Sequence, residues 1–138
     1  MEVVFDINAI NRMTEQIILD KLERVGSMIE GEAKKNLSGQ NGPELRAFDT
    51  GYLMGSITHE VNEADLSVRI GTNVEYAPYI EFGTGLYAEN GKGRKTPWPV
   101  KTKKGWRMIH GMHSRPFLRR ALYDNLAKIK EIFHASRW

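Results

Sequence analysis

The strongest constraint on the fold is a stripe of apolar residues that recurs every three to five positions from residue 10 to residue 37. Because an α-helix turns once in about 3.6 residues, this spacing places the stripe on one side of a helix and leaves the charged residues on the other sides. We therefore expect one long amphipathic helix from Ile7 to Leu37, with Asp6 as its N-cap. Gly26 and Gly31 lie inside it and mark either a kink or a close contact. The stripe consists of Ile10, Met13, Ile17, Leu22, Val25, Ile29, Ala33 and Leu37.

Two later segments have the patterns of β-hairpins. Over residues 57–71, apolar and polar residues alternate on both sides of a short turn, which predicts a half-buried antiparallel hairpin. A second hairpin is expected over residues 98–109, around a basic turn. Helix breakers in residues 38–48 predict a mobile loop, and a single helical turn is expected over residues 52–56.

A last helix is expected after Ser114, which would cap it, with Pro116 in the first turn, where a missing N–H does no harm. The order of helix, strands and helix predicts an α+β fold. In this fold, the long N-terminal helix and the C-terminal helix pack on a small, mostly antiparallel β-sheet. The buried stripe of the last helix would consist of Leu118, Leu122, Leu126 (or Ala127), Ile129 and Phe133.

The length and composition are those of one globular domain. The 138 residues are 41% hydrophobic and 27% charged, so we expect a single domain over residues 1–138, from which a basic hairpin, residues 86–112, projects. The absence of cysteine excludes disulfides, thiolate metal sites and cysteine nucleophiles. No apolar run approaches the roughly 20 residues that cross a bilayer, and the first residues do not resemble a signal peptide. We expect a soluble protein of a reducing compartment, without a membrane partner.

Positive charge is concentrated in one part of the chain. Residues 90–123 hold ten lysines and arginines and no acidic residue, whereas residues 1–89 hold fifteen acidic and seven basic residues. Such a run is often only a solvated face, but it also suits a binding surface for nucleic-acid phosphate or for the acidic face of a neighbouring protein. The candidate interaction residues are Lys92, Arg94, Lys95, Lys101, Lys103, Lys104 and Arg107.

Neither a metal site nor a phosphate loop is predicted. His110 and His113 are three residues apart, but no carboxylate lies near them in the sequence, and a zinc site needs about three or four protein ligands. Residues 91–96, GKGRKT, look superficially like a phosphate-binding loop, yet they lack its required spacing of glycine and lysine. We therefore expect no metal and no cofactor.

Asp49, Glu75 and Glu81 are the candidates for a pair of catalytic carboxylates. Partial burial in its aromatic segment would raise the pKa of Glu81, as a general acid requires. A salt bridge from Glu81 to an arginine of the last helix is the simpler interpretation. A small hydrolase that uses Glu81 or Asp49 is therefore the weakest functional hypothesis, and we assign no catalytic residue.

Three short motifs follow the long helix. Residues 49–57 read DTGYLMGSI, residues 76–84 read YAPYIEFGT, and residues 115–122 read RPFLRRAL. In this order and spacing they resemble the gene-ten-product-like tail-component family of tailed bacteriophages, whose members act in the neck as head–tail joining or tail-completion proteins. The resemblance extends from about Ile7 to Phe133, and the chain departs from the family pattern in the length and basicity of residues 86–112.

This resemblance implies a non-enzymatic structural subunit of the virion neck or tail that is assembled in the cytoplasm of the host bacterium. It implies a ring, commonly of six copies, between the portal or connector and the tail tube. The partners would then be further copies of the chain, connector or portal-side proteins, and tail-tube proteins. The basic hairpin would reach a neighbouring subunit or an adjacent ring, or it would face the DNA that passes through the lumen.

Within this picture, the motif residues have structural roles. Glycines would allow turns that a side chain would block, aromatic residues would fill the gap between sheet and helix, and Glu81 would bind Arg115 or Arg119. Tyr79 and Phe82 would pack against Phe117 and Leu118. The full set of motif residues is Asp49, Gly51, Tyr76, Tyr79, Glu81, Phe82, Gly83, Pro116, Phe117 and Leu118.

The main alternative is a nucleic-acid-binding module. In that hypothesis the basic hairpin tracks the phosphates, and Trp98 and Trp106 stack on bases. The excess of acidic residues in the first 89 residues argues against it, because that part of the molecule would repel a duplex.

Overall fold

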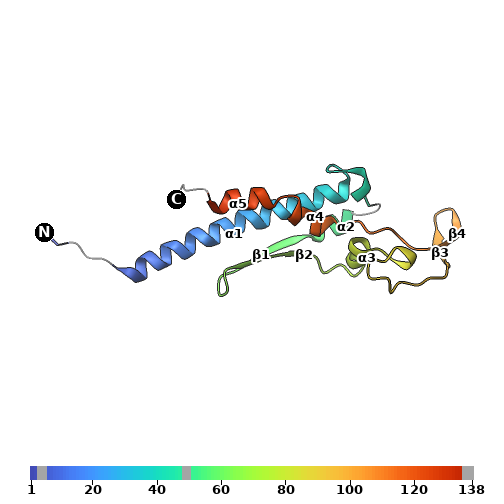
Figure 1. Ribbon diagram of the computed structural model, residues 1–138, viewed down its shortest axis with the longest axis horizontal. Coiled ribbons are helices and arrows are strands. Elements are labelled where there is room, and N and C mark those ends of the chain that lie inside the picture. Colours follow the sequence, from blue (N-terminus) through green and yellow to red (C-terminus); the bar gives the residue numbers. More distant parts are fainter. Residues whose placement is uncertain (3–5, 48–50, 135–138) are drawn as a thin grey trace.

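The computed structural model describes residues 1–2, 6–47 and 51–134, and its fold is α+β, as predicted (Figure 1). The motif residue Asp49 lies outside the described residues. The strands form two separate two-stranded antiparallel sheets rather than one small sheet. In chain order the elements are α1 (Ile7–Ser38), a 3-10 turn (Pro43–Leu45), α2 (Gly51–Ser56), β1 (Thr58–Asn62), β2 (Ser67–Gly71), α3 (Ala77–Phe82), a 3-10 turn (Gly85–Tyr87), β3 (Trp98–Thr102), β4 (Gly105–Ile109), α4 (Phe117–Tyr123) and α5 (Leu126–His134).

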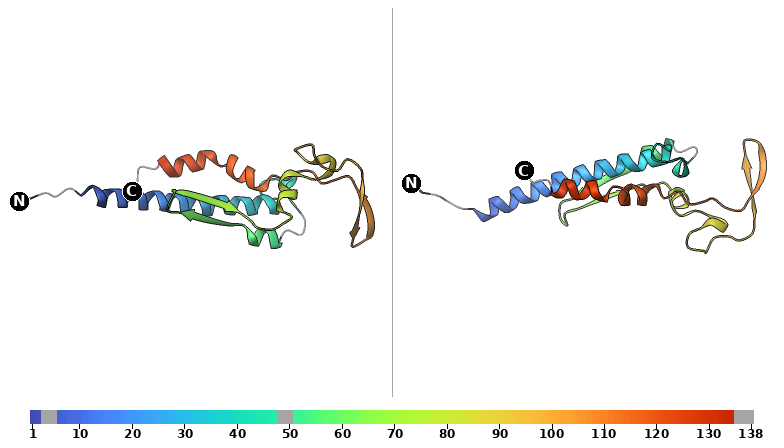
Figure 2. Two further views of the ribbon diagram at one scale, coloured as in Figure 1. Left: turned by 90° about the horizontal axis from the view of Figure 1, so that it is seen from below. Right: turned by 45° about the horizontal axis from the view of Figure 1, so that its top comes forward.

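The molecule is elongated along α1. Helices α4 and α5 lie along one side of α1, and the β1–β2 hairpin lies along another side (Figures 1 and 2). Helix α3 lies past the C-terminal end of α1, and the β3–β4 hairpin forms the far end of the molecule (Figure 2). The turn of the β1–β2 hairpin thus lies toward the N-terminal end of α1, whereas the β3–β4 hairpin lies at the opposite end of the molecule and runs across its long axis (Figures 1 and 2).

The predicted long helix is confirmed, but only its second half carries the core. The Oδ1 atom of Asp6 accepts the backbone N–H of Asn8 at 3.0 Å, as an N-cap does. The predicted stripe is buried from Leu22 onward, whereas Met13 is 66% exposed. The N-terminal part of α1 extends beyond the other elements (Figure 1). The buried residues of α1 that form the core are Val25, Ile29, Ala33 and Leu37.

The first predicted hairpin is also confirmed, and Gly26 explains how it lies so close to α1. The register pairs His59 with Ile70 and Val61 with Val68, so these four side chains share the face toward the helix. A Cβ atom on Gly26 would lie 2.6 Å from Cδ2 of His59. Of the two predicted alternatives for Gly26, a kink or a close contact, the structure therefore shows the close contact.

His59 lies between two carboxylates of α1. Its Nε2 atom is 2.7 Å from Oε1 of Glu23, and its Nδ1 atom is 3.2 Å from Oε1 of Glu30. The hydrogen bond with Glu23 is the main reason why the pKa of His59 is raised, and Glu30 adds to the effect against the opposing effect of burial. A protonated His59 thus holds the hairpin to the helix.

The predicted last helix is broken into two. It ends at Tyr123 and resumes at Leu126, and the side-chain amide of Asn125 donates to the carbonyl of Ala121 at 2.8 Å. The predicted cap is wrong as well, because Pro116 and not Ser114 directly precedes α4.

The predicted stripe of the last helix is wrong in part. Phe117, Ala121 and Asn125, which are spaced four apart, are buried, whereas Leu122, Leu126 and Phe133 are exposed. Leu118 and Ile129 are half-buried against the core. The small Ala121 lets α4 approach α1, and the side-chain amide of Asn36 on α1 donates to the carbonyl of Phe117 at 2.8 Å. Close packing against α1 therefore determines which face of α4 is buried.

We predict that the stabilising effect of His59 disappears as the pH rises. Because its pKa is raised on folding, its contribution is complete below about pH 6.5, the unfolded value, and it declines as the pH passes through the higher folded value. Urea unfolding of the wild type and of His59→Gln between pH 5.5 and pH 9 should show a difference in unfolding free energy that shrinks with pH. The exposed His134→Gln serves as the control, and a difference that does not change with pH would contradict this role.

Candidate interaction surface

Glu81 joins α3 to the start of α4. It is only 6% exposed, and its two carboxylate oxygens accept the backbone N–H groups of Leu118 and Arg119, each at 3.0 Å. These N–H groups belong to the first turn of α4, where they have no partner within the helix. A negative charge is also favourable at a helix N-terminus. Glu81 therefore acts as the cap of α4 from a distance of 37 residues in the sequence.

Arg119 completes this junction, so the predicted choice between Arg115 and Arg119 is resolved in favour of Arg119. Its Nε atom donates to Oε1 of Glu81 at 2.9 Å, and its Nη1 and Nη2 atoms bind the two carboxylate oxygens of Glu89 at 2.9 and 3.1 Å. These bonds hold the pKa of Glu89 below its usual value, with Arg119 as the main cause and Ser114 as a second one. The guanidinium also lies 4.6 Å from the centre of the Phe82 ring.

The oxygens of Glu81 are committed to this junction, which argues against a hydrolytic role. Both accept hydrogen bonds from α4 or from Arg119. Among the residues that the structure describes, no three histidine, aspartate or glutamate side chains are grouped as a metal site would require. His113 instead stacks on Tyr87, with ring centres 3.7 Å apart.

The predicted aromatic plug is wrong. Tyr76, Tyr79 and Phe82 are all exposed, Tyr79 by 60% and Phe82 by 48%, and neither Tyr79 nor Phe82 belongs to the core cluster that contains Phe117 and against which Leu118 packs. Because the segment is a helix, spacings of three and four residues turn Ala77, Ile80 and Glu81 inward instead. The aromatic side chains are left on the surface.

The two motif glycines differ. Gly83 ends α3 with φ +79°, and a Cβ atom there would lie 2.6 Å from the carbonyl oxygen of Tyr87, so the predicted turn requires glycine. Gly51 begins α2 without a positive φ, and a Cβ atom there would meet only open space, so its predicted steric role is not supported.

A short backbone pairing fixes the segment that carries the basic hairpin. The N–H of Thr84 donates to the carbonyl of Met112, and that of Leu86 to the carbonyl of His110, each at 2.9 Å. The N–H of Met112 returns a bond to Oγ1 of Thr84 at 2.9 Å. These bonds tie the two ends of residues 86–112, which we name the basic arm, to the end of α3.

The cations of the basic arm have no acidic partner among the residues that the structure describes. Within residues 6–47 and 51–134, none of the seven predicted interaction residues forms an ion pair, whereas Arg119 and Arg120 of α4 are paired with carboxylates. Arg94 lies over the ring of Trp98, 5.6 Å from its centre. The arm thus presents its seven cations to solvent.

The β3–β4 hairpin also exposes apolar side chains. Pro99 pairs with Met108 and Lys101 with Trp106, so these four share one face. Trp106 is 70% exposed and Met108 is 62% exposed. Because an isolated two-stranded hairpin is only marginally stable in water, this face gains stability when another surface covers it.

The turn of the other hairpin has the opposite charge. Glu63 and Asp65 lie in the β1–β2 turn, Glu60 lies within β1 opposite Arg69, and all three acidic side chains are exposed. None of them forms a salt bridge within the described ranges, although Asp65 accepts the hydroxyl of Ser67 at 2.6 Å. This acidic turn and the basic arm lie toward opposite ends of the molecule (Figures 1 and 2).

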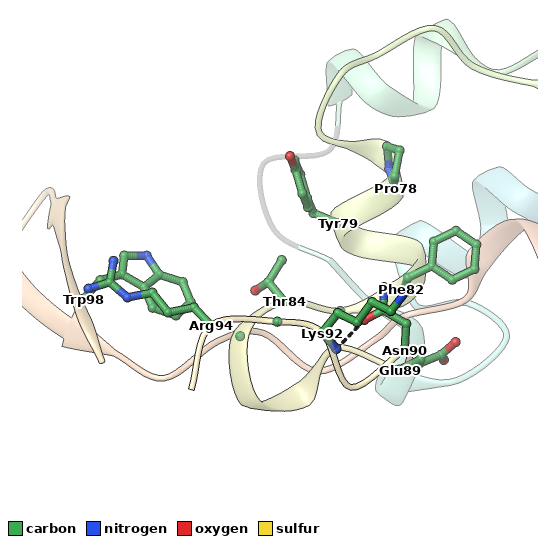
Figure 3. A pocket seen from close by; sticks show the side chains of 13 residues that line it. Pro78, Tyr79, Phe82, Thr84, Glu89, Asn90, Lys92, Arg94 and Trp98 are labelled. Atoms are coloured by element: carbon green, nitrogen blue, oxygen red, sulfur yellow. Dashed lines mark hydrogen bonds between the residues drawn. The ribbon is translucent and has the colours of Figure 1, made fainter. Parts of the chain in front are cut away.

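A groove of about 840 Å³ lies between α3 and the base of the basic arm (Figure 3). Tyr79 and Phe82 of α3 line one side, and Trp98, with Arg94 beside it, lines another (Figure 3). Lys92 adds a second cation to the rim. No sequence pattern predicted this groove, because it forms from residues whose apolar side chains were expected in the core.

The folded chain thus has three surfaces that suit binding to other molecules: an acidic turn, a basic arm with an exposed apolar face, and an apolar groove with cations on its rim. Among the described helices, none has both the length and the apolarity that a bilayer span requires. These are the properties of a protein that works as a part of an assembly.

Comparison with known families agrees with a role as a part of an assembly. Residues 2–83, more than half of the chain, match the family model described as "Bacteriophage HK97-gp10, putative tail-component". The protein belongs to this family and is a structural component of a phage tail, so its place is in the virion. The match includes the first motif and all but the last residue of the second, and the basic arm and α4 follow it in the sequence. No curated protein and no solved structure matches the chain.

We predict that Glu81→Ala destabilises the protein by about 2–4 kcal/mol, because it leaves two helix N–H groups and a partly buried guanidinium without their acceptor. The control is Glu131→Ala on the exposed face of α5, which should change the unfolding free energy by no more than about 0.5 kcal/mol. Chemical denaturation of the three proteins measures both values. Equal stabilities would show that Glu81 does not hold the junction.

Proposed function

We propose that the protein is a non-enzymatic subunit that forms a ring at the head–tail junction or at the tail end during virion assembly. The observation that carries this proposal is the separation of charge between the two hairpins. The basic arm lies at one end with no carboxylate partner among the described residues of its own chain, and the acidic turn lies toward the other end. Copies arranged head to tail would place each basic arm against the acidic turn of the next copy.

Repeated head-to-tail pairing can produce a closed ring. A contact between two different surfaces repeats from copy to copy, and it closes into a ring when the rotation between neighbours divides a full turn evenly. Six copies are the number that the family resemblance implies. The uncovered face around Trp106 and Met108 suits a protein partner, because aromatic residues and methionine are enriched in protein interfaces.

Within this proposal, residues 1–138 form a single domain, and assembly takes place in the cytoplasm of the host bacterium. The ring would contact connector or portal-side proteins on one side and tail-tube proteins on the other. Surfaces not used between copies remain for these partners, among them the exposed side chains of Leu122, Tyr123 and Leu126.

The alternative function is nucleic-acid binding by the basic arm, and Trp106 favours it because its exposed ring is free to stack on a base. Trp98, the second predicted stacking residue, is half-buried, and Arg94 lies over its ring. We therefore rank DNA below an acidic protein surface as the partner of the arm.

We predict that reversing the charge of the arm blocks assembly and that reversing its partner restores it. In a phage that lacks the native gene, Lys103→Glu with Lys104→Glu should lower the titre by about 100-fold or more, because like charges then face each other across the contact. Adding Glu63→Lys and Asp65→Lys to the same chain should recover most of the titre. Separate heads and tails, or tails of uncontrolled length, should be visible by electron microscopy when joining fails.

The matched control for that experiment is Lys128→Glu with Lys130→Glu, which makes the same change of charge on the exposed face of α5. A normal titre of the arm variant would show that the basic arm does not make the proposed contact. Loss of titre without recovery by the acidic-turn substitutions would reject the pairing between copies.

A DNA-binding measurement separates the alternative. If proteins are the partners of the arm, affinity for duplex DNA at physiological salt should be no tighter than ordinary non-specific binding, about 10⁻⁴–10⁻⁶ M. Fluorescence anisotropy across salt concentrations measures it. Tighter binding that weakens steeply with salt, and that loses strength when Lys101, Lys103 and Lys104 are replaced by alanine, would favour nucleic-acid binding instead.

A further inference from the structure

The groove beside the basic arm has a specific chemical character. Tyr79 and Phe82, both of them exposed, line it, and Ala88 and Trp98 add further apolar surface. Its volume of about 840 Å³ is within the range of sites that hold a small ligand or a short peptide segment. The groove therefore suits an occupant with several apolar side chains.

The rim of the groove adds a requirement for negative charge. Lys92 and Arg94 lie along it and form no ion pair within the described residues. Glu89, the one carboxylate among the described residues that line the groove, is bound through both oxygens by Arg119. An occupant with acidic residues beside its apolar ones would match both features.

The chain itself contains such a segment. Residues 2–6 read EVVFD, so that three apolar residues, Val3, Val4 and Phe5, stand between two acidic ones. Among the side chains of α1 that the structure describes, the first buried hydrophobic one is Leu22, well after this segment in the sequence. By composition, the segment is complementary to the groove in both hydrophobicity and charge.

The segment cannot reach the groove of its own molecule. It precedes α1, whose 32 residues span about 48 Å, and the groove lies beyond the opposite end of that helix (Figures 1 and 2). Six extended residues reach at most about 22 Å. Only a second copy can place its segment there.

We propose that residues 2–6 of one copy bind in the groove between α3 and the basic arm of the next copy. This inference rests on the proposed head-to-tail assembly and has the same polarity as the pairing of basic arm and acidic turn. Phe5 and Val4 would cover the exposed rings of Tyr79 and Phe82, and Glu2 would approach Lys92 and Arg94. Each subunit would thus be held by its neighbour at two separate places.

The absence of cysteine in the chain permits a direct test. Full-length Val4→Cys and Ala88→Cys are mixed under mild oxidation, with one of them isotopically labelled, so that the mass of a mixed disulfide identifies a contact between copies. The control pair is Val4→Cys mixed with Ser27→Cys, because Ser27 lies on an exposed face of α1. We expect the mixed disulfide between Val4→Cys and Ala88→Cys to form at least about tenfold faster than that of the control pair. Equal rates would overturn the inference.

Charge and sequence controls sharpen the result. Lys92→Glu with Arg94→Glu, placed in the Ala88→Cys chain, should reduce the rate to that of the control pair, whereas Lys128→Glu with Lys130→Glu should not. A peptide of residues 1–8 in excess should compete, and the same peptide with Val4→Asp should not. A rate that responds equally to both charge pairs would show that only general electrostatic attraction is at work.

The outcome is distinguishable from that of the proposed function. If the groove pair fails to form while the acidic-turn substitutions still restore the titre of the arm variant, this inference alone is rejected. If the groove pair forms but the arm variant assembles normally, the pairing of arm and acidic turn is rejected and the groove contact remains.

Discussion

The structure depends on one buried carboxylate. Glu81 accepts two backbone N–H groups and one guanidinium bond of α4, and so it joins a motif in the middle of the chain to one near its end. Through Phe117, the same start of α4 packs against α1, where Asn36 holds its carbonyl. An unpaired charge at this depth would be costly, and so the position of α4 relative to α3 is fixed. The base of the basic arm lies between these two helices in the sequence, and its orientation follows from theirs.

This junction creates a molecule with two unequal halves. One half contains a core in which α1 is covered by α4, α5 and the β1–β2 hairpin. The other half contains α3, the groove and the basic arm, where large apolar side chains remain in contact with water. Such exposure is unusual in a protein that acts alone, and it is expected in a subunit whose neighbours cover it. A bacteriophage tail component meets this condition, because its native environment is an assembly.

The α1 helix and both hairpins could be predicted because they depend on local periodicity and turn residues. The salt bridge of Glu81 to the last helix was predicted from charge alone, and the sequence left its partner open between Arg115 and Arg119. The errors concern which side of a short element faces inward. Tyr79 and Phe82 were expected to fill a gap between sheet and helix. They instead lie on helix α3, which leaves both side chains exposed. In the last helix, close packing at Ala121 and a break at Asn125 turned Leu122 and Leu126 outward.

Periodicity, turn residues and charge were enough to predict the long helix, both hairpins and the separation of charge along the chain, and the motifs were enough to predict the family. Packing in three dimensions places the acidic turn and the basic arm toward opposite ends of the molecule (Figure 2). It also places His59 between Glu23 and Glu30 and forms the groove with a cationic rim beside α3. The physical reason is that periodicity reports the neighbours of a residue within one helix or strand. The direction of a hairpin and the shape of a groove depend instead on contacts between residues far apart in the chain.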